Sequence, residues 1–318
     1  MTDVWDGLTA FSDTYTCYSS AVAAWTALAD VDWAGTIDPG LWLTLTQPKD
    51  GLFGFVHFPP GLRRTLGLRR SGAATAAAAF EGVMAEVRRS GRVIVAGDGF
   101  HLPWHVAHGR VHVPHWYVLV DGDDGAAVFD PFTCRNELGI QSAHRATVSE
   151  GELAVLLRGL PGDDPVLRLR ETFALGDDAG PPLDARYQWY AHEPVSDVIE
   201  PIGTSGPDAV RALAEHFRAR GQNEEAYWQV DDIWSIARHR AFLARRAQAR
   251  AARDGDGVLA AWVEEHAAPL AKRWGHMPPL LMQATLALRA GREASSSVPD
   301  RLEALADMEA AGAASSHG

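Results

Sequence analysis

The sequence is poor in cysteine, in basic residues and in long apolar runs, and each shortage excludes a class of protein. Its 318 residues include two cysteines, too few for a disulfide framework. The formal net charge is −12, which argues against a general nucleic-acid binder, because the surface of such a protein is basic. No run approaches the roughly 18 consecutive apolar residues of a membrane-spanning helix, and no signal-peptide pattern opens the chain. We therefore expect a cytoplasmic protein with neither a nucleic-acid nor a membrane partner.

The composition, 47% hydrophobic and 22% charged, is typical of a globular protein with room for one large domain or two ordinary ones. Helical and β patterns mix in residues 1–160, and a Pro/Gly/Asp-rich connector follows over 161–206. Residues 207–293 are rich in Ala, Leu and Arg and predict a helical accessory region. The low-complexity tail, 294–318, is expected to fray.

Four elements of the first part can be predicted from pattern. Residues 17–29 predict a helix with Thr14 or Thr16 as its N-cap, and residues 73–90 predict a second helix. Residues 92–98 predict a buried strand. Residues 111–132 predict a β-hairpin, because two β-rich runs flank a cluster of Gly and Asp.

Cys17 lies in the stretch TYTCYSSAVAAW, in the first turn of the first predicted helix. The free N–H groups and the dipole of a helix N-terminus favour a thiolate, and the same N–H groups can stabilise an oxyanion. The alternative is that Cys17 merely packs. Cys134 follows the hairpin without a helix start, which makes it the weaker candidate for a nucleophile.

The hairpin supplies partners for such a thiol. A tight turn around Gly122 and Asp123 places His115 directly opposite Asp130. A histidine held by a carboxylate can take the proton of a thiol while the carboxylate sets its tautomer. A one-residue change in register would break this pairing. The alternative is a structural histidine, with Asp130 capping the turn at Pro131.

Five histidines within fifteen residues raise the question of a metal site. They are His101, His105, His108, His112 and His115. Their spacing matches no zinc pattern, and Pro103 and Pro114 interrupt the regular spacing that chelation from one element needs, so we expect neither a metal nor another cofactor. His112 is the main rival of His115 as the base.

Three segments in order resemble the family named after the N-terminal domain of butirosin biosynthesis protein H, a papain-like cysteine acyltransferase. The segments are YTCYSSAVAAW, RVIVAGDGFHLPWH and HWYVLVDGDDGAAVFDPF. The resemblance is carried mainly by residues 15–132, and the segment IWSIARHRAFLARR resembles the helical region that often accompanies the domain.

The resemblance implies an α+β fold with a papain-like, cysteine-protease-type catalytic domain, followed by a mostly helical C-terminal region. It implies Cys17 as nucleophile, His115 as base and Asp130 as its orienting group. Substrate-binding positions near the acyl pocket are implied at Asp98, Phe100, Trp104 and Tyr18. The chain departs from the family at Thr16, where the family usually has histidine. It also lacks the glutamine that papain-like peptidases place before the cysteine for their oxyanion hole.

The function expected from the resemblance is cysteine-dependent acyl transfer in specialised metabolite biosynthesis. An acyl or aminoacyl group passes from a carrier-protein thioester through an acyl-cysteine to an amine or hydroxyl of a small-molecule acceptor. The same residues also suit a thioesterase or cyclase, or a peptidase or amidase, and the non-enzyme alternative is an inactive papain-like scaffold. The partner is expected to be an acidic acyl or peptidyl carrier protein with a phosphopantetheine-bound donor. Residues 238–253, with six arginines and no acidic residue, are a candidate surface for docking it, unless these arginines pair with neighbours such as Asp231 and Asp232.

Overall fold

The chain divides into two compact units, each with its own hydrophobic core, in a computed structural model. Unit 1 comprises Met1–Gly40 and Phe58–Glu200, and unit 2 comprises Leu41–His57 and Pro201–Gly318. The residues that the structure describes are 2–29, 32–37, 43–49, 52–57, 66–122, 125–159, 186–193 and 203–315.

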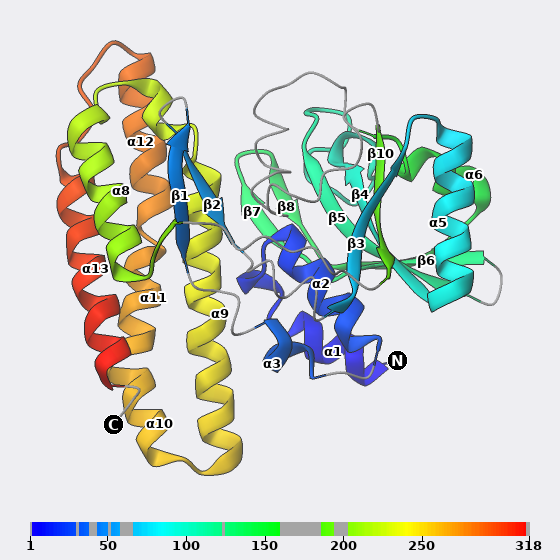
Figure 1. Cartoon of the computed structure of the whole chain (residues 1–318), viewed down its shortest axis with the longest axis horizontal. Helices are drawn as coiled ribbons and strands as arrows, with labels where there is room; N and C mark the ends of the chain where they lie inside the picture. Colours follow the sequence, from blue (N-terminus) through cyan, green and yellow to red (C-terminus); the bar gives the residue numbers. More distant parts are fainter. Residues whose placement is uncertain are drawn as a thin grey trace. The chain divides into compact units, whose positions relative to one another are not determined.

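A six-stranded antiparallel sheet forms the centre of unit 1, with strand order β3-β10-β4-β5-β6-β9 (Figure 1). Its strands are β3 (Leu68–Ala73), β4 (Arg92–Asp98), β5 (Pro114–Gly122), β6 (Gly125–Asp130), β9 (His144–Val148) and β10 (Tyr187–His192). A separate small hairpin is made by β7 (Cys134–Asn136) and β8 (Gly139–Gln141). The pairing of β4 with β5 and of β5 with β6 sets the positions of the residues that matter for function.

Helices cover both faces of this sheet, which explains why its central strands are almost continuously apolar. On one face the side chains of Tyr117 and Leu119 pack with α5 (Ala76–Ser90) and α6 (Glu150–Leu156). On the other face Trp116 contacts Tyr18 of α2 (Cys17–Ala27), with ring centroids 5.7 Å apart. The shorter helices of unit 1 are α1 (Thr2–Thr9), the 3-10 turn η1 (Ser12–Thr14), α3 (Trp33–Ile37) and the 3-10 turn η3 (Gly99–His101).

The predicted helix at 17–29 is confirmed as α2, and Thr16 is its N-cap. The second predicted helix begins three residues later than expected, at Ala76, because Leu68–Ala73 forms strand β3 against β10. It ends at Ser90 and is capped by Gly91, whose φ of 76° is the left-handed conformation that favours glycine. The buried strand over 92–98 is confirmed as β4.

The hairpin is confirmed, but its predicted register is wrong by two residues. Gly122 pairs with Gly125 and Val118 with Phe129, so His115 is not directly opposite Asp130. Residues 123 and 124, which connect the strands, lie outside the described residues. A shift of two residues leaves every side chain on its predicted face, because strand side chains alternate with period two. His115 and Asp130 therefore become diagonal neighbours on one face, still within reach of each other.

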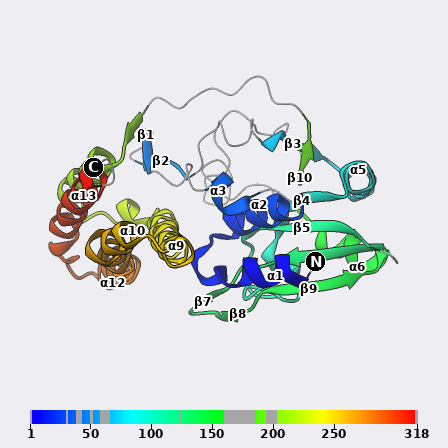
Figure 2. The ribbon, with the colours of Figure 1, turned by 90° about the horizontal axis from the view of Figure 1, so that it is seen from below.

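Unit 2 combines a small antiparallel sheet, of order β11-β1-β2, with a helical region. Its strands are β1 (Thr44–Lys49), β2 (Leu52–Val56) and β11 (Gly203–Ser205). Its helices are α8 (Pro207–Arg220), the 3-10 turn η5 (Glu224–Tyr227), α9 (Val230–Asp254), α10 (Gly257–Trp262), the π-helical turn η6 (Val263–Ala267), α11 (Ala268–Trp274), α12 (Met277–Arg289) and α13 (Ser297–Ser315). Figure 2 shows α9 and α12 nearly end-on.

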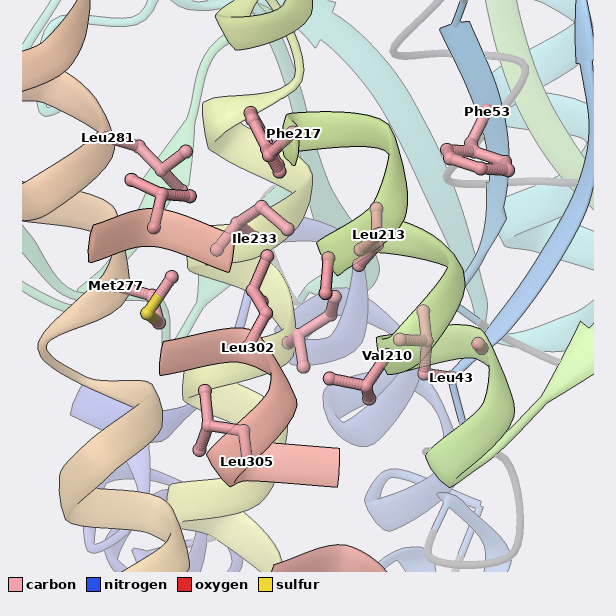
Figure 3. Packing of buried hydrophobic residues seen from close by; sticks show 14 of the residues in the cluster. Leu43, Phe53, Val210, Leu213, Phe217, Ile233, Met277, Leu281, Leu302 and Leu305 are labelled. Carbon is pink, nitrogen blue, oxygen red and sulfur yellow. The ribbon is translucent and has the colours of Figure 1, made fainter. Parts of the chain in front are cut away.

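The core of unit 2 joins residues from both parts of its sequence. Leu43 and Phe53 pack with side chains of α8, among them Val210 and Leu213 (Figure 3). The amide of Gln229 adds to this packing, since its Oε1 accepts from Phe53 N at 3.1 Å and its Nε2 donates to Phe53 O at 2.5 Å. The helical C-terminal region expected from composition is present.

The sequence-based boundaries at 160, 206 and 293 do not coincide with the two units. Part of the expected connector is strand β10 of the unit 1 sheet, and residues 41–57, expected in the first domain, belong to unit 2. The tail expected to fray is helix α13 through Ser315, which buries Leu302 and Leu305. Among the described helices, none is both long enough and apolar enough to cross a membrane.

A buried ion pair ties α9 to α13 within unit 2. Arg240 Nε donates to Glu309 Oε1 at 2.9 Å, and Nη2 donates to Oε2 at 3.0 Å. Trp274 Nε1 donates to the same carboxylate at 2.9 Å. Removing one partner of a buried pair leaves an uncompensated charge, which costs about 3–5 kcal/mol.

We expect Arg240→Met to destabilise unit 2 by about 3–5 kcal/mol, measured by urea unfolding followed through the helical circular dichroism signal. Combining it with Glu309→Gln is expected to restore part of the loss, because no charge is then left buried and the Trp274 indole keeps an acceptor. Arg245→Met, at an exposed position of the same helix, is the control. A double variant no more stable than Arg240→Met alone contradicts this account of the pair.

Candidate active site

Cys17 is the first residue of α2, held there by a complete capping box. The Thr16 side chain accepts from Ser19 N at 3.1 Å, and Ser19 Oγ accepts from Thr16 N at 2.8 Å. Both residues are buried, and the rest of α2 is buried from Tyr18 to Ala27. The helix start is therefore fixed, while Cys17 itself stays partly exposed. Thr16, the departure from the family pattern, is the residue that provides the cap.

His115 and Asp130 are brought together by the β5–β6 pairing. His115 Nε2 lies 2.7 Å from Asp130 Oδ2, and both side chains are buried. The structure thus places a hydrogen-bonded histidine–carboxylate pair at the positions expected from sequence, through a diagonal contact rather than the direct one.

The carboxylate of Asp130 accepts hydrogen bonds from donors at four separate positions in the chain. Besides His115, its Oδ2 accepts from Trp104 Nε1 at 2.8 Å and from Gln141 Nε2 at 3.4 Å. Its Oδ1 accepts from Phe132 N at 3.1 Å. A buried carboxylate needs such donors to remain charged. Sequence reasoning missed Gln141, since a lone glutamine on a short strand carries no recognisable signal.

The ring of His115 also interacts with Cys17. Burial lowers the pKa of His115, but the charge of Asp130, the hydrogen bond to it and the neighbouring Cys17 thiol raise the pKa to about 9. Asp130 occupies Nε2, and Nδ1 makes no hydrogen bond of good geometry among the described residues. Nδ1 is therefore the ring nitrogen left for the thiol. This order of contacts, from carboxylate to imidazole to sulfur, is the one that thiol activation requires.

A second histidine, His105, packs against the ring of His115. The two ring centroids are 4.5 Å apart, and His105 Nδ1 accepts from Ala107 N at 3.0 Å. Burial, and then the charge of His115, lower the pKa of His105 to about 2. Gly99 is required at this place, because a Cβ there would lie 2.6 Å from His105 Nδ1. The dense run of histidines was visible in the sequence, but not this packing.

His112, the rival base, bonds a different carboxylate. Its Nδ1 lies 2.6 Å from Oδ2 of Asp98, which is fully buried, and its ring stacks on Phe100 at 4.4 Å with an interplanar angle of 20°. Asp98 Oδ1 accepts from Phe100 N at 3.0 Å. His112 and Asp98 thus form a second histidine–aspartate pair, and Phe100 stacks on its imidazole. Asp98 and Phe100 are both residues that were expected near the acyl pocket.

The remaining residues expected from sequence have different surroundings. Trp104 contacts the Asp130 carboxylate and stacks on His144, with centroids 4.4 Å apart. Tyr18 is buried between Trp116 and Tyr190. Cys134 lies on β7 and is partly exposed.

The five clustered histidines separate into different contacts. His105 lies on His115, whereas His101 and His112 flank Asp98, with His101 Nε2 at 3.8 Å from the carboxylate. Within the described ranges, no three His, Cys, Asp or Glu side chains are grouped so that they could hold a metal ion.

No protein-family model matches the chain, and no curated protein matches it in a sequence search.

The geometry makes a prediction about the titration of His115. In an NMR titration of labelled histidines, its transition is expected near pH 9. Asp130→Asn should move the midpoint to lower pH, because the loss of the carboxylate charge removes a stabiliser of the imidazolium. Cys17→Ala should also lower the midpoint, by less. The His115 signal is assigned by its loss in His115→Gln, and a midpoint unchanged by Asp130→Asn contradicts the assigned cause.

Proposed function

We propose that the protein is a cysteine-dependent acyltransferase that carries an acyl group on Cys17. One observation carries this proposal: a partly exposed thiol at a capped helix start neighbours a histidine that is bound to a buried carboxylate at 2.7 Å. A core cysteine needs neither an imidazole neighbour nor a fixed helix start. Supporting the proposal is the order and spacing of motifs that resemble the butirosin biosynthesis protein H N-terminal family.

The acylation step uses the pair of charges that this geometry favours. The Cys17 thiolate attacks the carbonyl carbon of a thioester, and a sulfur–carbon bond forms while the donor's carbon–sulfur bond breaks. The imidazolium of His115 gives its proton to the departing thiolate. N–H groups of the first turn of α2, beginning with that of Cys17, are the proposed oxyanion donors, since they face the negative charge that develops near the sulfur.

The second step returns the site to its starting state. An acceptor attacks the acyl carbon and gives one proton to neutral His115 as the bond to the Cys17 sulfur breaks. Thiolate and imidazolium are thereby restored. With an amine as acceptor the product is an amide, with water the same residues make a thioesterase, and with an internal nucleophile they make a cyclase.

The proposed donor is a thioester on an acidic carrier protein, because exchange between two thiols is nearly balanced and needs no strong leaving-group activation. The expected docking helix is α9, but its arginines are not equivalent. Arg240 is buried against Glu309, and Arg250 and Arg253 contact Asp254. Asp232, a neighbour considered for these arginines, contacts His57 instead, at 2.7 Å. The support for a carrier protein is therefore the resemblance and the chemistry of the thiol, more than this helix.

Intact-mass measurement after incubation with acyl N-acetylcysteamine thioesters tests the proposal. We expect an added acyl group on the wild-type protein and none on Cys17→Ala, with Cys134→Ala as the matched control that still accepts the group. His115→Gln should slow formation of the adduct by about 10²–10⁴-fold, and Asp130→Asn by less, because it removes no reacting group. An adduct that persists in Cys17→Ala, or a wild-type protein that none of the thioesters acylates, would sink the proposed function.

A further inference from the structure

Trp104 was expected from sequence as a substrate-binding residue, but its indole N–H is bound to the Asp130 carboxylate. Nε1 donates to Oδ2 at 2.8 Å, and the same oxygen lies 2.7 Å from His115 Nε2. Oδ1 accepts instead from the backbone N–H of Phe132, at 3.1 Å. One carboxylate oxygen is therefore shared by the indole and the imidazole of the proposed base, and the other oxygen is held by the backbone.

The loop that carries Trp104 contacts both members of the His115–Asp130 pair. Trp104 binds the carboxylate, and the next residue, His105, packs on the imidazole with ring centroids 4.5 Å apart. A hydrogen bond within the loop fixes this second contact, since Ala107 N donates to His105 Nδ1 at 3.0 Å. Two consecutive residues of one loop therefore restrict the carboxylate and the imidazole together.

The indole ring of Trp104 is itself fixed by two aromatic neighbours. His144 stacks on it, with centroids 4.4 Å apart and an interplanar angle of 6°. Tyr117 meets it edge-on at 5.7 Å, and the Tyr117 hydroxyl donates to Leu156 O at 3.1 Å. His144 is directly opposite Asp130 in the pairing of β6 with β9, so its side chain and the carboxylate share one face of the sheet. Contacts within the protein thus account for the position of the indole N–H.

The histidine and tyrosine side chains that neighbour the pair are neutral near pH 7. Burial, and then the charge of His115, lower the pKa of His105 to about 2, and burial lowers the pKa of His144 by more than Asp130 raises it. Burial, and then the charge of Asp130, raise the pKa of Tyr117. The indole of Trp104 is neutral as well. Its hydrogen bond stabilises and orients the carboxylate without adding a positive charge that would compete with the imidazolium.

We propose that Trp104 is a positioning residue of the Cys17 reaction, which acts through the Asp130 carboxylate and does not line the acyl pocket. The inference rests on the proposed acyl transfer. The indole N–H restrains the oxygen to which His115 Nε2 is bound, so the ring keeps Nδ1 towards the sulfur. It also takes up part of the negative charge on Oδ2, which leaves the imidazolium able to release its proton to the departing thiolate. The indole proton stays on Nε1 throughout.

Trp104→Phe tests this role, because it keeps an aromatic ring for the stacking on His144 and removes the N–H donor. Trp5→Phe is the matched control. Trp5 is half-buried, as Trp104 is, and its ring meets that of Phe129, the residue before Asp130, at 4.8 Å. Thermal unfolding followed by circular dichroism establishes that both variants are folded at the temperature of the measurements.

Acylation of Cys17 by acetyl and by octanoyl N-acetylcysteamine thioesters is followed by intact mass. We expect Trp104→Phe to slow it about tenfold with both donors, because a positioning role does not depend on the length of the acyl chain. In an Asp130→Asn background the same change should cost less than about twofold, since the indole then has no carboxylate to act on. Trp5→Phe should behave as the wild type. A loss confined to the octanoyl donor, an equal loss in the Asp130→Asn background, or no loss with either donor overturns the inference.

The NMR titration of His115 provides a readout that packing alone does not move. Loss of the N–H leaves more negative charge on Oδ2, so the imidazolium is held more tightly and the midpoint should shift to higher pH in Trp104→Phe. Trp5→Phe should leave the midpoint unchanged. An unmoved midpoint overturns the inference, and so does a shift to lower pH, as expected for Asp130→Asn, because it shows that the pair has separated. A wild type that neither thioester acylates overturns the proposed function itself.

Discussion

The contact between the Asp130 carboxylate and the His115 imidazole is the constraint on which the proposed chemistry depends. A carboxylate buried in this way stays charged when donors surround it. Here the donors come from strand β5 of the main sheet, the backbone just after β6, the small hairpin and the loop that carries Trp104. Each donor restricts where the carboxylate lies, and the carboxylate restricts the ring. The other ring nitrogen of His115, Nδ1, is thereby left for the sulfur of Cys17. Several elements together therefore determine where the proton shared by the thiol and the imidazole can lie.

The two histidine–aspartate pairs share the same type of hydrogen bond but differ in how deeply the histidine is buried. His115 is enclosed, and its charge depends on Asp130 and on the thiol beside it. His112 keeps part of its ring in solvent and stacks on an aromatic side chain. His105 lies against the first pair and His101 beside the second, and burial lowers the pKa of both. Neither pair therefore has a second positively charged histidine next to it. Five histidines close in sequence are thereby given different environments.

Local patterns predicted the elements of the site, whereas distant pairings set its details. The polar residues before Cys17 and the apolar run after it were enough to place the helix start. Alternation along the hairpin was enough to place His115 and Asp130 on one face even with a register wrong by two residues, because that error preserves the face. The bond from Trp104 to Asp130 and the pairing of Asp98 with His112 depend on how a loop folds back over the sheet, and spacing does not encode such contacts. The unit boundaries were missed because strands β1 and β10 pair with segments far away in sequence.

The position of β10 has a consequence for how the chain acquires its structure. This strand lies between β3 and β4 in the sheet, although more than eighty residues of chain separate it from either of them. During synthesis, β3 and one side of β4 therefore remain without their final neighbour until residue 192 has left the ribosome. Such late, non-local pairing is slow and leaves strand edges open to other chains. A gene fragment that stops after β9 would encode every proposed catalytic residue and still lack the strand that joins the two parts of their sheet.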